Sequence, residues 1–233
     1  EALKAFDNLK SIIGLPISQM NYFIAHAAVQ RKDIIFINRN FIDWLSSLSS
    51  SNQADDFLDV LSDGSRFCPY LHVSMQSGST LILKRMKRRY DREFLMDRLS
   101  AAREHIGGLV LGADVMAGFP TESERDFEDS LDVINSAEII YPHVFCFSGR
   151  PGTPAARIPR QIERAERRRR AAILRDAGQT LRREALNRMT GRSGRLIVER
   201  SDPGEKPGDY HGRLANYMPV RLEDPENASA AEI

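Results

Sequence analysis

Strand and helix patterns alternate between residues 71 and 147, and this alternation constrains the fold more than any other feature of the sequence. Apolar or alternating runs predict strands at 71–75, 109–116 and 143–147. Longer segments with apolar residues at helical spacing separate these strands. Strands connected through helices pair in parallel by right-handed crossovers. We therefore expect an α/β protein with a parallel sheet.

The helices between the predicted strands carry recognisable ends. A first helix is expected at 80–89, after the turn Gln76–Ser79. Asp91 is the predicted N-cap of a second helix, whose buried stripe is Leu95, Leu99, Ala102 and Ile106. Thr121 and Glu124 have the spacing of a capping box at the start of a third helix.

The chain divides into four parts by composition and pattern. Residues 1–45 show neither clear turn signals nor a chemical motif, and we leave them unassigned. The alternating elements occupy 46–159, after a serine-rich stretch and a short helix expected at 56–61. An arginine-rich helix is expected within 160–190, and a small β module within 191–233, with strands at 196–199 and 217–222.

Positive charge is concentrated in one segment, although the whole chain carries only +1. Residues 157–195 contain thirteen arginines, no lysine and four acids, which gives this segment a net charge of +9. A concentrated arginine face attracts polyanions. A solvated helix face has the same composition, so charge alone leaves both interpretations open.

Several classes of protein are excluded by composition. No apolar run approaches the length needed to cross a bilayer, and the first residues lack the pattern of a signal peptide, so we expect a cytoplasmic protein that contacts no membrane. The chain has two cysteines, Cys68 and Cys146, too far apart in sequence for a disulfide scaffold, and we expect two reduced, buried thiols. The five histidines lack metal-ligand spacing, and no metal site is predicted. His72 and His143 fall inside predicted strands, where core or sheet-face positions are expected.

Three loops leave the carboxyl ends of the predicted strands, where α/β proteins bind ligands. Gln76, Ser77, Gly78 and Ser79 offer hydroxyls and a flexible backbone. Asp114 ends the next strand, and Gly118 follows in its loop. Arg150 lies in the third loop, 148–153. Each signal is weak alone, because a Ser-Gly turn is more often only a turn and Asp114 can be an ordinary paired acid.

Three stretches together carry a specific resemblance. They read LHVSMQSGSTLILKRMKRRYDREFL, ADVMAGFPTESERDFEDSLDVI and HVFCFSGRPGTPAARIPRQI. Their sequences, order and spacing resemble those of the radical S-adenosylmethionine (SAM) methylthiotransferases. The segment GRLIVERSD and the later HGRLANYMPVRL resemble the opening of the family's C-terminal TRAM domain, a small RNA-binding β-barrel. The resemblance runs from about residue 45 to about residue 222.

The resemblance implies a fold and an activity. The fold would be the second half of a radical-SAM-type (βα) barrel, followed by a long helix and a truncated TRAM-like module. Such enzymes are transferases that use SAM and [4Fe–4S] clusters held by cysteine thiolates. They add a methylthio group to tRNA, and the wording RFCPYLHVSMQSGS resembles the members that act on threonylcarbamoyladenosine beside the anticodon. One branch of the family modifies a ribosomal protein instead.

The resemblance also assigns candidate residues. Gln76, Ser77 and Gly78, with Asp114 and Gly118, are the predicted SAM-binding residues. Arg150 and the run Arg167, Arg168, Arg169 and Arg170 are the predicted contacts to tRNA phosphates, which carry affinity but read no sequence. No catalytic residue is assigned.

Two departures from the family pattern limit what these residues can do. The family's CxxxCxxC cluster motif is absent, and Thr121 stands where the family has a glycine. The chain is therefore expected to be inactive alone. Three hypotheses stay open: a fragment of a tRNA methylthiotransferase, a non-catalytic RNA-binding remnant, or a half-barrel complemented by a separate chain that supplies the cysteines.

Overall fold

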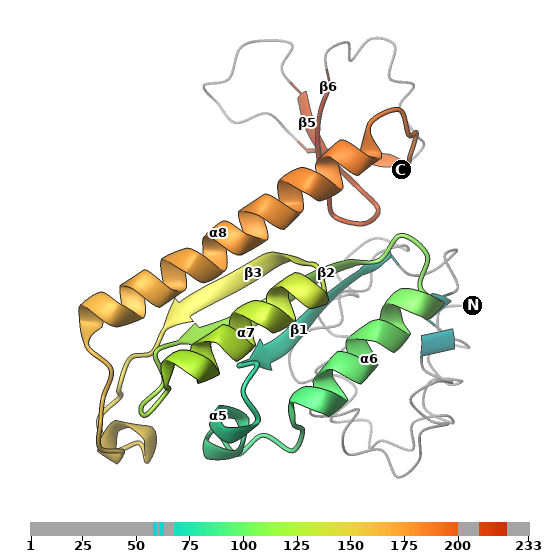
Figure 1. The fold of residues 1–233 in the computed structure, drawn as a ribbon. Helices are drawn as coiled ribbons and strands as arrows, with labels where there is room; N and C mark the ends of the chain where they lie inside the picture. The colour runs from blue at the N-terminus through green and yellow to red at the C-terminus, as the bar shows by residue number, and fades with distance from the viewer. Residues whose placement is uncertain (1–57, 60, 63–67, 200–209, 223–233) are drawn as a thin grey trace.

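One parallel sheet, a layer of helices, a long helix and a small antiparallel sheet make up the part of the chain that the structure describes (Figure 1). The structure is a computed structural model, and it describes residues 58, 59, 61, 62, 68–199 and 210–222. The unassigned segment 1–45 lies outside these residues. Within the described part, no helix is both long and apolar enough to cross a membrane.

The main sheet confirms the predicted parallel pairing. β1 (Tyr70–Gln76), β2 (Val110–Ala117) and β3 (Ile139–Cys146) lie side by side in the order β1-β2-β3. Both strand pairs are parallel. β3 begins at Ile139, earlier than the predicted start at residue 143. Pro142 lies inside the strand. Proline is tolerated there since β3 is an edge strand of this sheet.

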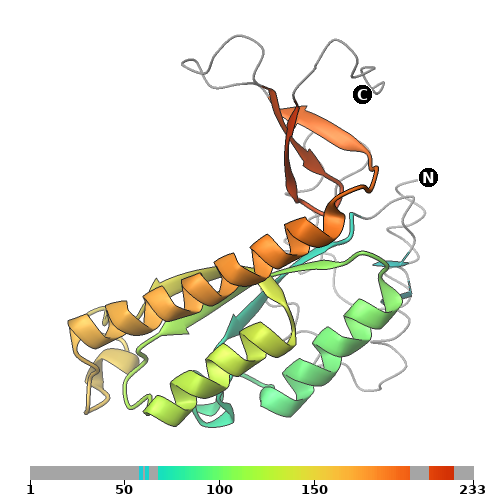
Figure 2. The ribbon, with the colours of Figure 1, turned by 45° about the horizontal axis from the view of Figure 1, so that its top comes forward.

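Helices α6 (Arg92–His105) and α7 (Glu124–Ser136) pack on one face of the main sheet, as Figures 1 and 2 show. The predicted stripe of α6 is buried, from Leu95 through Ile106. The sheet contributes alternate residues to the same core, namely Leu71, Val73, Met75, Leu111, Ala113 and Val115. Each large aliphatic side chain buried in this way contributes about 1.5–3 kcal/mol, so this layer holds the domain together.

The ends of the helices differ partly from the prediction. Asp91 is the N-cap of α6, as expected, and its side chain accepts a hydrogen bond from Phe94 N at 2.9 Å. The predicted Thr121–Glu124 capping box is wrong. Ser123 caps α7 instead, and Ser123 and Asp126 exchange side-chain and backbone hydrogen bonds. Thr121 has a φ of +69°, a left-handed turn conformation from which a helix cannot start directly.

Two short helices near the beginning of the described residues can also be compared with the predictions. α5 (Thr80–Arg85) is shorter than the predicted helix 80–89, because Lys87 has a φ of +58° and turns the chain. The helix expected at 56–61 is helical at its described residues, and Leu58 and Leu61 are buried in the core.

α8 (Arg164–Met189) is the predicted arginine-rich helix, and it packs mainly along β3. On α8, Leu174 and Ala185 are buried, while Ala177, Leu181 and Met189 are partly buried against the core. Arg175 donates a hydrogen bond to the carbonyl of Val144 at 3.0 Å. This bond satisfies a backbone acceptor on the edge strand β3.

A small antiparallel sheet follows α8. β4 (Leu196–Glu199), β5 (Tyr210–Leu214) and β6 (Pro219–Leu222) pair in the order β4-β5-β6. β5 lies between the two predicted strands, where none was predicted, because its residues YHGRL lack a clear alternating pattern. The β module itself is confirmed, whereas its identity as a TRAM-like module stays a prediction.

The small sheet is docked on the main sheet through aromatic rings. The ring centroids of Tyr70 and Tyr217 are 4.9 Å apart, and those of Tyr141 and Tyr217 are 5.9 Å apart. Tyr141 OH donates to the carbonyl of Tyr217 at 3.3 Å. Met218 is buried beside Val110 on β2. Aromatic pairs of this kind contribute about 0.5–1.5 kcal/mol beyond their buried area, so the junction is a packed interface.

Gly178 allows α8 to approach β3 closely. A Cβ atom at this position would lie 2.2 Å from Pro142 Cγ, a distance that real Cβ atoms do not tolerate. A glycine inside a helix costs roughly 1 kcal/mol relative to alanine. Its presence here is explained by the contact with Pro142.

We predict that Gly178→Ala destabilises the protein by about 1–3 kcal/mol, the usual range for overpacking a core. Urea unfolding followed by circular dichroism measures the change. Gln179→Ala, at the exposed neighbouring position, is the matched control and should change stability by less than about 0.5 kcal/mol. A gain in stability from Gly178→Ala would contradict the close packing of α8 on β3.

Candidate functional site

A row of polar side chains crosses the main sheet on the face opposite α6 and α7. Side chains alternate between the two faces of a strand. Since Leu71 and Val73 point into the helix-covered core, Tyr70 and His72 point the other way. Asp114, between two core residues of β2, lies on the same face. We call Tyr70, His72, Asp114 and His143 the polar face.

The polar face is a connected network in which His72, Asp114 and His143 each come from a different strand. His72 Nε2 lies 3.2 Å from Asp114 Oδ1, and His143 Nδ1 lies 3.4 Å from the same oxygen. Tyr70 OH lies 3.1 Å from His72 Nδ1. A carboxylate only accepts hydrogen bonds, so His72 donates through Nε2, and its Nδ1 then accepts from Tyr70 OH. The sheet-face positions expected for both histidines are confirmed.

The electrostatics of the polar face favour an ionised acid beside a neutral phenol. The hydrogen bond from His72 lowers the pKa of Asp114, against the opposing effect of partial burial. Burial raises the pKa of Tyr70, and the neighbouring Tyr217 and Tyr141 raise it further. Near neutral pH the network therefore presents a carboxylate that can accept hydrogen bonds from a hydroxyl or ammonium group.

The first predicted ligand loop is locked against α7. Ser77 and Gly78 are buried, and Gly78 N donates to Ser130 Oγ at 2.8 Å. A Cβ atom on Gly78 would lie 2.3 Å from the carbonyl oxygen of Asp129, so only glycine fits. Ser77 and Gly78 thus hold the turn in place, while Gln76 ends β1 with a φ of +62° and is only half-buried.

The second predicted loop is held by α8. Gly118 has a φ of +74°, and a Cβ atom there would lie 2.3 Å from Arg167 Cγ. Gly118 N donates to Glu122 Oε1 at 3.1 Å. Arg167 in turn donates to the carbonyl oxygens of Phe147 at 2.7 Å and Ile162 at 2.6 Å. The predicted cofactor residue Gly118 and the predicted RNA contact Arg167 are therefore parts of one packed junction.

A buried ion pair lies at the centre of this junction. Arg170 is 5% exposed and Glu122 is 3% exposed. Arg170 Nη1 donates to Glu122 Oε1 at 2.7 Å, and the same guanidinium reaches Glu124 at 3.0 Å and Glu166 at 2.7 Å. Burial raises the pKa of Glu122, and the hydrogen bonds from Arg170 and Gly118 offset part of that rise. Sequence reasoning gave no signal for Glu122, because its partner is distant in the chain.

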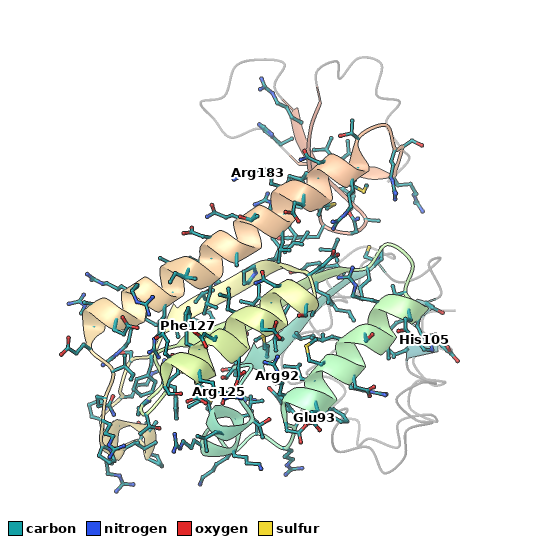
Figure 3. The ribbon with its side chains drawn as sticks, in the orientation of Figure 1. Arg92, Glu93, His105, Arg125, Phe127 and Arg183 are labelled. Carbon is teal, nitrogen blue, oxygen red and sulfur yellow. The ribbon has the colours of Figure 1, made fainter. Side chains whose placement is uncertain are left out.

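The predicted RNA contacts differ in their availability. Arg170 also lies over the ring of Phe127, labelled in Figure 3, and its donors are taken by protein oxygens. Arg169 is exposed but paired with Glu124 and Glu166. Arg150 and Arg168 are exposed, and their side chains form no ion pair with a described residue. Arg150 and Arg168 are thus the members of the predicted set best placed to meet a phosphate.

The cysteines do not form a cluster site. Cys146 is exposed at the end of β3, where its Sγ donates to the carbonyl of Arg167 at 3.6 Å, and Cys68 is partly exposed. The prediction of two buried thiols is therefore wrong, since Cys146 stands at the sheet edge beside α8. A [4Fe–4S] cluster held by cysteine thiolates needs more of them than the two that this sequence contains. The described residues also hold no group of three side chains placed to bind a metal ion.

Comparison with known families matches this chain to one superfamily. The sequence model described as the Radical SAM superfamily matches residues 13–134. The matched range includes β1 and β2 of the main sheet, and it begins within the segment that the sequence analysis leaves unassigned.

Comparison with curated proteins identifies tRNA-modifying relatives. The chain is 37% identical over 179 residues to the threonylcarbamoyladenosine tRNA methylthiotransferase MtaB of Rickettsia prowazekii, covering 77% of this chain and 40% of the relative. It is 32% identical to the protein of the same name from Bacillus subtilis, covering 78% and 41%. It is 36% identical to the tRNA-2-methylthio-N(6)-dimethylallyladenosine synthase of Ruegeria pomeroyi, covering 75% and 39%. The chain spans about two fifths of the length of these relatives.

We predict that removing Arg170 destabilises the protein strongly. Arg170→Met should cost about 3–5 kcal/mol, because it leaves Glu122 as a buried, unpaired charge. Arg168→Met changes an exposed arginine two positions earlier and should cost less than about 0.5 kcal/mol. Denaturant unfolding of both variants measures the difference. Equal stabilities would show that Arg170 is not the residue that joins α8 to the loop after β2.

The lowered pKa of Asp114 generates a second prediction. Its ionised form favours the folded state, so this contribution is present above the ordinary pKa of 3.8 and is lost as pH falls through the lower folded value. Asp114→Asn should therefore lose roughly 1 kcal/mol at about pH 6 and much less at about pH 3. Urea unfolding at both pH values tests this. Asp176→Asn, an exposed acid unpaired among the described residues, should show no such dependence.

Proposed function

The chain belongs to the radical SAM superfamily, and within it to the methylthiotransferases, and from that membership we propose that it forms part of a tRNA methylthiotransferase. One observation carries the proposal. The family match covers β1 and β2, the strands that contribute Tyr70, His72 and Asp114 to the polar face. The polar face and the adjoining loops form the part of the domain that would hold S-adenosylmethionine.

The side chains of the polar face fit S-adenosylmethionine by their chemistry. The cofactor carries ribose hydroxyls and an ammonium group, and Asp114 can accept hydrogen bonds from either. Gln76 adds an amide at the end of β1, and Gly118 lets the loop after β2 pack closely against Arg167 of α8. When bound in such enzymes, S-adenosylmethionine supplies the adenosyl group for radical formation. In this chain we assign Asp114 and Gln76 to orienting the cofactor, and we assign Ser77, Gly78 and Gly118 to the loop backbone that surrounds it.

The residues present do not fit the iron–sulfur cluster that the family uses. A cluster requires thiolates that these 233 residues do not supply, because Cys68 and Cys146 are the only cysteines. We therefore propose that this stretch is inactive by itself. Cysteines from elsewhere would complete it, either in the remaining part of a longer protein or in a separate chain.

The proposed substrate is a modified adenosine beside the tRNA anticodon. Two of the relatives described above are named for threonylcarbamoyladenosine, and a third is named for dimethylallyladenosine. The sequence RFCPYLHVSMQSGS favours threonylcarbamoyladenosine as the substrate. The β4–β6 sheet would be the beginning of a TRAM-like module that contacts the same tRNA. A non-catalytic RNA-binding remnant is the alternative function, and a catalytic assay separates the two.

A chimeric enzyme tests the proposed function. The part of the Bacillus subtilis relative that aligns with this chain is replaced by this chain, in a bacterial strain that lacks its own enzyme for the modification. We expect the methylthiolated threonylcarbamoyladenosine to reappear in digested tRNA, measured by liquid chromatography and mass spectrometry. Asp114→Ala in the chimera should reduce the product about tenfold or more, because orienting interactions of this kind contribute several kcal/mol.

The control is the same chimera with Asp176→Ala, which changes an exposed acid on α8 and should leave the product level intact. A chimera that accumulates in soluble form but restores neither methylthiolated nucleoside would contradict the proposal. Restoration of the dimethylallyl product instead would show that the substrate class is right and the specific base is wrong.

A further inference from the structure

A group of cations outside the predicted RNA contacts lies on and just after α5. The sequence KRMKRR spans residues 84–89. Lys84, Lys87 and Arg89 are exposed, and their side chains form no ion pair with a described residue. We call these three residues the α5 patch. None of them is among the predicted contacts to tRNA phosphates.

A second group lies on the connection between β3 and α8. Arg150, Arg157 and Arg160 are exposed, and they too lack an ion-pair partner among the described residues. The connection includes a short 3-10 turn, Ala155–Arg157, that is held by hydrogen bonds to Thr153 and Pro154. We call these three arginines the loop patch.

A shared apolar base holds the two patches side by side. Ile82 of α5, Phe119 of the loop after β2 and Phe147 of the loop after β3 form one buried cluster. Met86 packs on this cluster from the α5 side, and Ala155 and Ile158 pack on it from the loop side. The side chains of both patches therefore project from segments that pack on the same buried cluster. Figure 1 shows both segments at the same edge of the molecule, beyond the carboxyl ends of the strands.

Hydrogen bonds strengthen this arrangement through Thr121. Arg85 of α5 donates to the Thr121 side chain, and Thr121 N donates to the carbonyl of Arg160 at 3.1 Å. The left-handed backbone of Thr121 turns its chain between the two patches. Thr121 thus links α5 to the β3–α8 connection, at the position where the family has a glycine.

Two acids near this edge are already engaged. Glu122 is buried against Arg170, and Asp126 accepts hydrogen bonds from Ser79 and Ser123. On the body of α8, by contrast, the charges of Arg169, Arg170 and Arg188 are balanced by glutamates. The α5 patch and the loop patch thus place six exposed cations, none with an ion-pair partner among the described residues, at this edge of the sheet.

We propose that the α5 patch and the loop patch together bind the phosphate backbone of RNA. Several fixed cations on one edge can each neutralise a phosphate and release counterions. A lipid surface fits less well, because a six-residue helix offers no apolar face long enough to enter a membrane. The proposal rests on the proposed function, and it places the RNA at the edge where Gln76 and Gly118 lie, so that a nucleotide would reach the polar face from there.

Anisotropy titrations of the full chain with fluorescently labelled, unfractionated bacterial tRNA test the proposal. The α5 variant is Lys87→Gln with Arg89→Gln, and the loop variant is Arg157→Gln with Arg160→Gln. Each should weaken binding about tenfold at moderate salt. Each should also reduce the slope of log K against log salt by about 1.5–2, from about 50 to about 200 mM, as expected for two lost phosphate contacts.

The matched control is Arg183→Gln with Arg192→Gln, which removes one exposed charge from the C-terminal part of α8 and one from the segment just after it. Figure 3 labels Arg183 near the small sheet, away from α5. The control should bind within about twofold of the unmodified chain. Thermal unfolding of every variant should match that of the unmodified chain, because these side chains are exposed.

The outcomes separate the two proposals. If the unmodified chain binds tRNA and the patch variants bind equally well, or if the control loses as much affinity, the patches are not the RNA surface and the proposed function stands. If the unmodified chain does not bind tRNA at all, both this surface and the tRNA substrate of the proposed function are overturned. Binding that is insensitive to salt also contradicts phosphate contact.

Discussion

The buried pair between Arg170 and Glu122 is the interaction on which the arrangement of the loops depends. Glu122 binds the backbone of Gly118, and Arg170 belongs to the same helical turn as Arg167, whose aliphatic stem packs against that glycine. A buried ion pair contributes little net stability, because desolvation offsets its attraction. Its effect is geometric, since neither charge can leave its partner without a large penalty. The loop after β2 is therefore fixed to α8.

This geometry explains why a charge count misjudges the arginine-rich helix. The net charge of +9 over residues 157–195 indicates a polyanion surface, yet Arg169 and Arg170 share glutamates and Arg175 binds a backbone carbonyl. Composition cannot reveal such pairing, because Glu122 and Glu124 lie far from their partners in the sequence. Among the described residues, exposed cations without an ion-pair partner also lie on the connection before α8 and on and just after α5, outside the densest part of the arginine-rich segment.

The parts of the fold that sequence could predict are those set by local pattern. β1, β2 and α6 follow directly from alternation, from helical spacing and from the Asp91 cap. The parts it could not predict depend on contacts distant in the chain. β5 forms because it pairs with two neighbours, although its own sequence alternates poorly. Ser123 replaces Thr121 as the cap because the turn at Thr121 is fixed by Arg85 and Arg160. Of the candidate site, Asp114 was predicted, but its two histidine partners come from other strands.

Tyr70 connects the polar face to the small sheet. Its hydroxyl faces His72 Nδ1 at 3.1 Å, and its ring packs on Tyr217 at 4.9 Å. The partly buried phenol thus contacts both neighbours at once. Tyr70 OH lies beside the His72 nitrogen that does not face Asp114, so a ring packed against Tyr217 contacts the imidazole of the polar face. The small sheet, joined to the domain through α8, thus contacts the polar face through Tyr217 and Tyr70.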